Sequence, residues 1–238
     1  MGSALGQFSL YHRKALSSLI ALRARSQVTW DRRNTTEFLV GRNLEADTSV
    51  GMLVGGAKDL LRMSHVYQVS KWDSAFIQFD YPRFYSQDRK FIGQGFAVEG
   101  AWSHHLRLAY PDFSIRLSGN LQDYSPRQTV SGKLPTLFQS GGSTIPASNV
   151  LPDDFHQIEL GAGIGESVFF SYGKTIRPFA FGGVNVNPET GVGANISGGL
   201  NGSIFGPDRL SLFGRYLRGG FGQDSTVTEW VLHYQLWF

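Results

Sequence analysis

The closest approach to a hydrolytic site in this sequence is the stretch Ser103-His104-His105. Ser103 and His105 are two residues apart, so on a β-strand both side chains point to one face, where an imidazole can activate a hydroxyl for attack on an ester. No acidic partner for His105 can be assigned, and the sequence has no Gly-x-Ser-x-Gly, zinc-helix or phosphate-loop motif. We therefore expect no catalytic residue, no metal and no cofactor, and a lipid-modifying enzyme is the least favoured function.

Charged side chains are the larger group of chemically active residues, and they recur at every second position of alternating stretches. Acids and bases are interspersed in a chain with a formal net charge of +3, and no basic block typical of nucleic-acid binding occurs. Two interpretations stay open: the charges pair across strands and stabilise a wall, or some of them line a path for solutes and set its selectivity. The lumen-facing candidates are Arg23, Arg25, Arg62, Glu99, His105, Arg116, Glu159, Arg177, Arg215, Glu229 and His233.

Strands with two different faces must position these residues. Over 226–238, apolar residues at even numbers alternate with mostly polar residues at odd numbers, and the same period recurs over 155–165, 175–187, 191–205 and 209–218. The first half is noisier and predicts strands near 16–31, 36–43, 49–57, 60–70, 74–84, 91–108 and 113–121, with 5–13 as a further strand or a lead-in. Short turn-forming links make neighbouring strands antiparallel, so we expect about twelve strands, or up to about sixteen.

The composition favours a membrane barrel over a soluble β-sandwich or lipocalin-like barrel. The chain has no run of 18 apolar residues that would form a transmembrane helix, and it contains 29 glycines and no cysteine. The expected strands are longer than the ~5–6 residues usual in soluble sheets and match the ~9–11 tilted residues that cross a bilayer. Because lipid offers no partner for unpaired backbone groups, we predict an all-β fold, a closed antiparallel transmembrane β-barrel.

One connection, residues 122–154, is far longer than the others and is rich in Ser, Gly and Pro. A structureless connection of this length is usually functional or disordered. If the last strand runs toward the periplasm, this loop lies on the extracellular side. We expect it to gate a pore, with Gln122, Tyr124, Arg127, Lys133, Asp153 and Asp154 as its candidate residues.

We expect residues 16–238 to form a single transmembrane barrel, preceded by a lead-in or extra strand over 1–15. The aromatic residue Phe238, with Leu236 and Tyr234 before it, resembles the sorting signal of Gram-negative outer-membrane proteins. This resemblance implies contact with outer-membrane lipid, and it implies the barrel-assembly machinery as a partner that reads the last strand. The inward aromatic residues Phe179, Phe181 and Phe213 serve either as packing or as a slide on which sugar rings stack.

Three stretches carry a wider resemblance: "DLLRMSHVYQVSKWDSAFIQFDYPRFYSQDRK", "GPDRLSLFGRYLRGGFG" and "VTEWVLHYQLWF". They resemble the C-terminal outer-membrane β-barrel of exopolysaccharide-export porins of the Pel type, similar in kind to exporters of cellulose and poly-N-acetylglucosamine. The resemblance implies passive export of a biofilm polysaccharide, gating by the long loop, and a periplasmic scaffold or lipoprotein partner. The chain departs from the family in its expected strand number, since such barrels usually have about sixteen strands, and in having no tetratricopeptide repeat. A general or small-solute diffusion porin is the alternative function.

Overall fold

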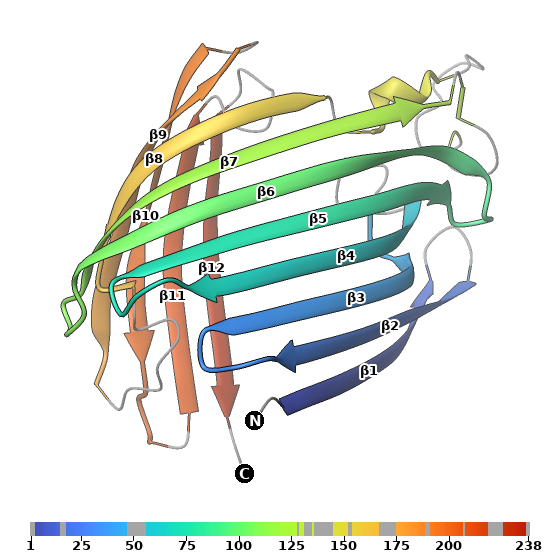
Figure 1. The fold of residues 1–238 in the computed structure, drawn as a ribbon. Helices are drawn as coiled ribbons and strands as arrows, with labels where there is room; N and C mark the ends of the chain where they lie inside the picture. The colour runs from blue at the N-terminus through green and yellow to red at the C-terminus, as the bar shows by residue number, and fades with distance from the viewer. Residues whose placement is uncertain are drawn as a thin grey trace. The chain divides into compact units, whose positions relative to one another are not determined.

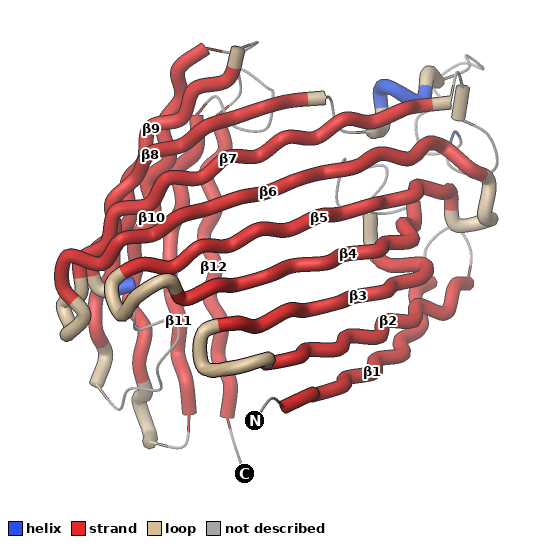
Figure 2. Tube along the Cα trace, in the orientation of Figure 1, coloured by secondary structure: helices blue, strands red, loops and turns tan. Residues whose placement is uncertain are grey.

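The chain folds into β-strands joined by turns, as Figures 1 and 2 show. The computed structural model describes residues 3–14, 18–46, 56–127, 129–130, 135, 145–151, 154–166, 175–188, 191–206, 208–218 and 226–236. Ala147–Asn149 forms a short 3₁₀ turn. No helix in the described part of the chain has the length and apolar character needed to cross a membrane.

Twelve strands are present in the described ranges, and their order in the sheet follows their order in the chain. Each strand whose register is defined, across β1–β4 and β8–β12, is antiparallel to its neighbours. The strands are β1 Ser3–Lys14, β2 Ser18–Thr29, β3 Asn34–Leu44, β4 Gly56–Gln68, β5 Asp73–Ser86, β6 Phe91–Arg107, β7 Phe113–Pro126, β8 Phe155–Ile164, β9 Arg177–Asn187, β10 Gly191–Gly202, β11 Asp208–Arg218 and β12 Thr226–Leu236.

The twelve strands divide the chain differently from the prediction. Residues 3–14 form β1, and β4 at Gly56–Gln68 joins the end of the strand expected over 49–57 to most of the one expected over 60–70. Residues 47–55 lie outside the described part. β7 runs on to Pro126, so Gln122 and Tyr124 lie on a strand and the connection to β8 begins at Arg127 rather than at residue 122.

The two sides of the strands differ in chemistry. One side, which we call the apolar face, exposes large apolar side chains on every strand: Phe8, Ile20, Val40, Leu61, Phe79, Phe96, Leu117, Leu160, Val184, Ile196, Leu212 and Leu232. The registers place such residues directly opposite one another, as with Val40 and Leu61 or Leu212 and Leu232. The other side, the polar face, carries the charged and amide side chains that alternate with them. Apolar side chains exposed on every strand suit contact with lipid rather than with water.

The contacts divide the chain into two compact units. The first comprises Met1–Tyr67, Phe76–Glu99 and Leu121–Asp154, and the second comprises Gln68–Ala75, Gly100–Asn120 and Phe155–Phe238. The first unit contains two small hydrophobic clusters, one around Phe84, Ile92 and Val150 and the other formed by Leu39, Leu44 and Leu60.

In the second unit, aromatic rings pack on glycines of the polar face. The Phe181 ring lies so close to Gly161 that a Cβ there would collide with it, and Gly183 also borders the ring. Phe213 lies directly opposite Gly199 in the register of β10 and β11, and Phe179 is buried. Glycine weakens a strand because it has no side chain to pack, and a ring laid over it restores the missing contact. The geometry of Phe181 is therefore that of packing against the strand wall.

Candidate functional site

All eleven charged candidates lie on the polar face of their strands. Each alternates with exposed apolar residues, as Arg62 does with Leu61 and Met63, and as Glu159 does with Ile158 and Leu160. The registers of β2–β4 place Arg25, Leu39 and Arg62 in one cross-strand row. These residues share one face because successive side chains of a β-strand point to opposite sides, so every second residue lies on the same side.

In the first unit, two arginines of the polar face are paired with acids of the neighbouring strand. Arg62 donates two hydrogen bonds to Asp80, of 2.7 Å from Nε and 2.6 Å from Nη2. Arg25 forms an ion pair with Glu37, which lies diagonally opposite it on β3. A bidentate arginine–carboxylate pair fixes both side chains in orientation as well as balancing their charge.

In the second unit, the pairing involves amide and aromatic partners as well as acids. Arg215 and Glu229 face each other directly across β11 and β12, 2.7 Å apart. Glu159 accepts a hydrogen bond of 3.5 Å from the Asn195 amide. The Arg177 guanidinium lies 4.6 Å from the centre of the Tyr110 ring, within the range of a cation–π contact.

The other candidates have different surroundings. Arg23 lies opposite Ser9 and Gly41 and is exposed, while His233 lies opposite Ser211. The Nδ1 atom of His105 is buried and has no hydrogen-bond partner. Glu99 and Arg116 are held by further interactions on the same face. The polar face is thus a mixed surface of paired charges, amides and glycines rather than a field of one sign.

The histidine next to the Ser103–His105 pair has partners of its own. The neighbouring residue, His104, donates a hydrogen bond of 2.7 Å from Nδ1 to the Asp73 carboxylate, and its ring stacks on Trp102. These three residues lie on the other side of the strands from His105. Among the described residues, no group of three acidic or histidine side chains is arranged to hold a metal ion.

The candidates for the gating loop fall into three groups. Gln122 and Tyr124 lie on the polar side of β7, and the Tyr124 hydroxyl lies 3.3 Å from Gln122 Oε1. Asp154, just before β8, accepts a hydrogen bond of 2.5 Å from the Tyr124 backbone amide, and the Arg127 amide donates one of 2.7 Å to the Ile92 carbonyl. Lys133 and Asp153 lie outside the described residues.

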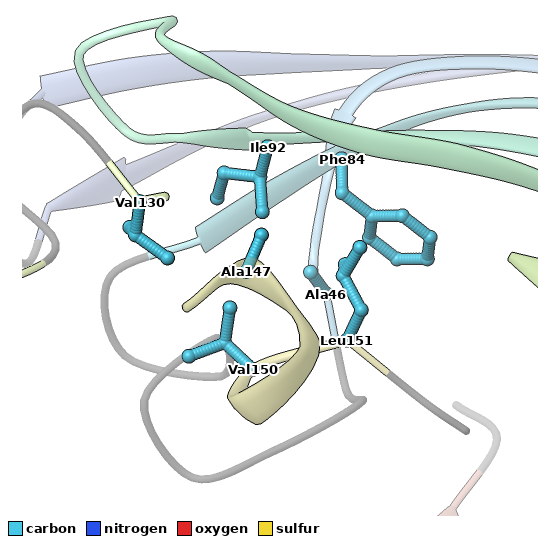
Figure 3. Packing of buried hydrophobic residues seen from close by; sticks show 7 residues of the cluster. All are labelled: Ala46, Phe84, Ile92, Val130, Ala147, Val150 and Leu151. Carbon is cyan, nitrogen blue, oxygen red and sulfur yellow. The ribbon is translucent and has the colours of Figure 1, made fainter. Parts of the chain in front are cut away.

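The last part of this connection, residues 145–151, packs onto the sheet. We call this segment the loop anchor. Its residues Ala147, Val150 and Leu151 are buried in a cluster with Ala46, Phe84, Ile92 and Val130, and Tyr124 packs at its border. Figure 3 shows these side chains pointing toward one another between the 3₁₀ turn and the strands. Phe84 stands on the same side of β5 as Asp80, so the loop anchor lies over the polar face.

Backbone hydrogen bonds and the small residue Gly93 also allow the loop anchor to pack against the sheet. The Val130 amide donates a 2.8 Å hydrogen bond to the Ile145 carbonyl, which ties the two ends of the connection together. A Cβ on Gly93 would lie 2.5 Å from Leu151 Cδ1 and 2.9 Å from the Ser125 carbonyl oxygen. Gly93 therefore provides the space into which Leu151 fits.

Sequence reasoning did not identify the loop anchor. Its apolar residues have no period, and their partners Ala46, Phe84 and Ile92 are distant in the chain. The one local signal is the group Ile145, Val150 and Leu151, which is unusually apolar for a stretch of Ser, Gly and Pro.

The residues of the expected sorting signal are only partly described. Tyr234 lies on β12 opposite Leu210 and is exposed on the apolar face. The side chain of Leu236 and the whole of Phe238 lie outside the described part.

Comparison with solved structures finds one with a similar fold and another that aligns less well. A structure described as a bacterial polysaccharide outer membrane secretin superposes with a TM-score of 0.64 at 10% identity, covering 97% of this chain and 78% of that chain. The beta domain of the Bordetella autotransporter BrkA aligns with a TM-score of 0.48 at 12% identity, covering 100% of this chain and 99% of that chain. No curated protein sequence matches this chain significantly.

The family model described as "PelB, C-terminal beta barrel domain" matches residues 3–237. The predicted fold class, an all-β antiparallel barrel of about twelve strands, is confirmed, as is the location in the bacterial outer membrane. The resemblance found in the sequence is also confirmed, because the match extends over nearly the whole chain: this protein belongs to the family of PelB C-terminal β-barrel domains.

Proposed function

We propose that this barrel is a passive conduit for the export of a polysaccharide, and that the β7–β8 connection gates it. The polar face is then the wall of the lumen, and the apolar face meets lipid. The observation that carries the proposal is the loop anchor, which packs over the polar side of the strands against Phe84 of β5, Gly93 of β6 and Tyr124 of β7. A connection seated on that side narrows the lumen, whereas one seated on the apolar side would leave it open.

The chemistry of the polar face supports a conduit for a hydrated polymer. Paired charges such as Arg62–Asp80 and Arg215–Glu229, with Asn195 and several glycines, present hydrogen-bonding groups without a strong net charge. Hydroxyl-rich chains can slide along such a wall because each contact is weak and easily exchanged. The similar solved structure is described as a polysaccharide secretin, which supports the same substrate class.

We propose further that the chain acts without catalysis. Its family is a barrel domain, and the Ser103–His105 pair has neither a mutual hydrogen bond nor an acidic partner among the described residues. Phospholipid micelles incubated with the purified barrel should release no fatty acid.

Planar-bilayer recordings test the gate. Wild-type protein should be nearly closed, and replacing residues 128–150 by a short Gly-Ser linker should open it. The double variant V150S/L151S should raise the open fraction by about a hundredfold, because removing two buried apolar side chains weakens the closed state by roughly 3 kcal/mol. Ser148, which is exposed in the same segment, provides the control: S148A should conduct like the wild type.

A diffusion porin would behave differently in the same recordings. It would conduct at once as wild type and would respond little to either loop change. For the open variant, soluble oligosaccharides of increasing length should interrupt the current with dwell times that grow with chain length. If no oligosaccharide interrupts the current of the open variant, the polysaccharide is not the substrate. The proposal that the connection gates the barrel would still stand.

A further inference from the structure

A group of arginines stands where the apolar face ends in the first unit. On β3, the exposed residues Phe38 and Val40 are followed on the same side by Arg42, and on β5 the exposed residues Phe79 and Tyr81 are followed by Arg83. On β4, Asp59 follows Met63 and Leu61 in the same way. Apolar side chains therefore give way to charged ones at one edge of three successive strands, the edge from which the β7–β8 connection leaves.

The carboxylate in this group is already neutralised. Asp59 accepts hydrogen bonds of 2.9 and 2.8 Å from the two terminal nitrogens of Arg89 and one of 2.9 Å from the Asn43 backbone amide. The Arg89 guanidinium also lies 3.9 Å from the centre of the Tyr85 ring. The hydrogen bonds to Asp59 raise the pKa of Arg89, so this arginine stays charged at every accessible pH. Asp59 is thus hydrogen-bonded to Arg89, and it attracts Arg42 only through space, without an ion pair.

Arg42 and Arg83 are the uncompensated cations. Both are exposed, and neither has a carboxylate within ion-pair distance among the described residues. Arg83 lies over two aromatic rings, 5.9 Å from the centre of Tyr85 and 5.6 Å from the centre of Phe91. Stacking on rings holds the plane of a guanidinium while its N–H groups at the edge stay available. Three arginines against one carboxylate leave two positive charges at this place.

We propose that Arg42 and Arg83, held beside the Asp59–Arg89 pair, form a binding site for the phosphate groups of a phosphorylated glycolipid in the outer leaflet, of the lipid A type. Planar guanidinium groups match phosphate oxygens bidentately. The site continues directly into the apolar stripe of Val40, Leu61 and Tyr81, so a ligand with acyl chains below and phosphates above fits it better than a free anion. The assignment to the outer leaflet rests on the proposed function, which places the long connection outside.

Native mass spectrometry of the full chain in detergent micelles measures this binding directly. The probes are bisphosphorylated lipid A, the same lipid without phosphates, phosphatidylglycerol and inorganic phosphate. Bisphosphorylated lipid A should bind at least about tenfold more tightly than the dephosphorylated lipid or phosphatidylglycerol. The double variant R42Q/R83Q should weaken its binding about thirtyfold, since each cation near a membrane surface contributes a factor of about five.

The matched control is R32Q, which removes an exposed arginine from the turn between β2 and β3 at the opposite edge of the same unit. Its affinity for lipid A should equal that of the wild type. Equal binding by R42Q/R83Q and wild type would overturn the site. Binding of phosphatidylglycerol or inorganic phosphate as tight as that of lipid A would overturn the glycolipid as its ligand.

Two further variants keep the test decisive. If R42Q/R83Q does not migrate as a folded barrel, the single variant R83Q should still bind lipid A about fivefold more weakly than the wild type. R83K should recover part of this affinity, because lysine keeps the charge but not the planar guanidinium group. The binding is measured without any current. If the barrel binds lipid A but fails the conductance tests, the lipid site is therefore supported and the proposed export function is rejected.

Discussion

Among the described ion pairs, Arg62–Asp80 has the least exposed carboxylate, with 14% of the Asp80 side chain accessible. Replacing Arg62 by Gln removes two charge-assisted hydrogen bonds and leaves that carboxylate unpaired in a partly enclosed place. We expect R62Q to lower the free energy of unfolding by about 2 kcal/mol. Urea unfolding in lipid vesicles, followed by tryptophan fluorescence, measures the change.

The pair Arg215–Glu229 provides the comparison, because both of its side chains are about two-fifths exposed. We expect R215Q to cost less than about 1 kcal/mol, since exposed pairs are screened by water. If the two variants lost equal stability, burial would not be what distinguishes the pairs.

Gly161 allows a second test at the scale of single residues. A methyl group there would collide with the Phe181 ring, while a methyl group at Gly182 would meet nothing within 4 Å. G161A should therefore destabilise the barrel by about 1–3 kcal/mol through displacement of the ring, and G182A should be close to neutral. Thermal unfolding of the two variants in the same detergent compares them, and an equal shift in both would rule out the ring as the cause.

At the scale of elements, the seat of the loop anchor depends on Gly93. A valine at Gly93 would occupy the space of Leu151 Cδ1 and press against the Ser125 carbonyl oxygen. We expect G93V to release residues 145–151 and to raise the conductance of the barrel toward that of the loop deletion. The matched control is G119A on β7, where a Cβ would have only an ordinary contact at 3.8 Å. A closed G93V channel with the loop still resistant to protease would contradict the seating described for Leu151.

The accuracy with which the strand bounds could be predicted from the sequence depended on how regularly apolar and polar residues alternate in each strand. The strands β9–β12 were predicted within a few residues, because each has one clean apolar side. β4 was divided between two predicted strands, because the charged pair Lys58-Asp59 interrupts the alternation where the predicted strands 49–57 and 60–70 were separated. β7 was ended too early, because "QDYSP" reads as a turn while Tyr124 is held on the strand by packing beside Phe84, a contact that local pattern does not contain.

The same limit applied to the candidate site. The charged residues could be assigned to the polar face from the period of two alone. Their partners could be only partly foreseen, because pairing depends on register: Arg25 meets Glu37 on a diagonal, whereas Arg215 meets Glu229 directly. The loop anchor could not be predicted, since its cluster joins residues from 46 to 151 that share no pattern.

At the scale of the whole molecule, a membrane barrel should resist detergent. We expect the native protein to migrate faster on a gel with sodium dodecyl sulfate before boiling than after it, because a membrane barrel pairs the backbone groups of its spanning strands with one another. The native protein should also require an amphiphile to stay dispersed, since apolar side chains are exposed on every strand. A protein that stayed monodisperse in plain buffer with no heat-dependent shift would exclude a lipid-facing surface.

The strand order has a consequence for how the chain reaches this state. Consecutive strands of the chain are neighbours in the sheet, so the sheet can be built by adding one hairpin at a time with little loop-closure entropy at each step. The exception is the join between β7 and β8, whose ends are separated by 28 intervening residues, 127–154. Assembly should pause there, and two fragments divided within that connection and produced together should recombine into one folded domain.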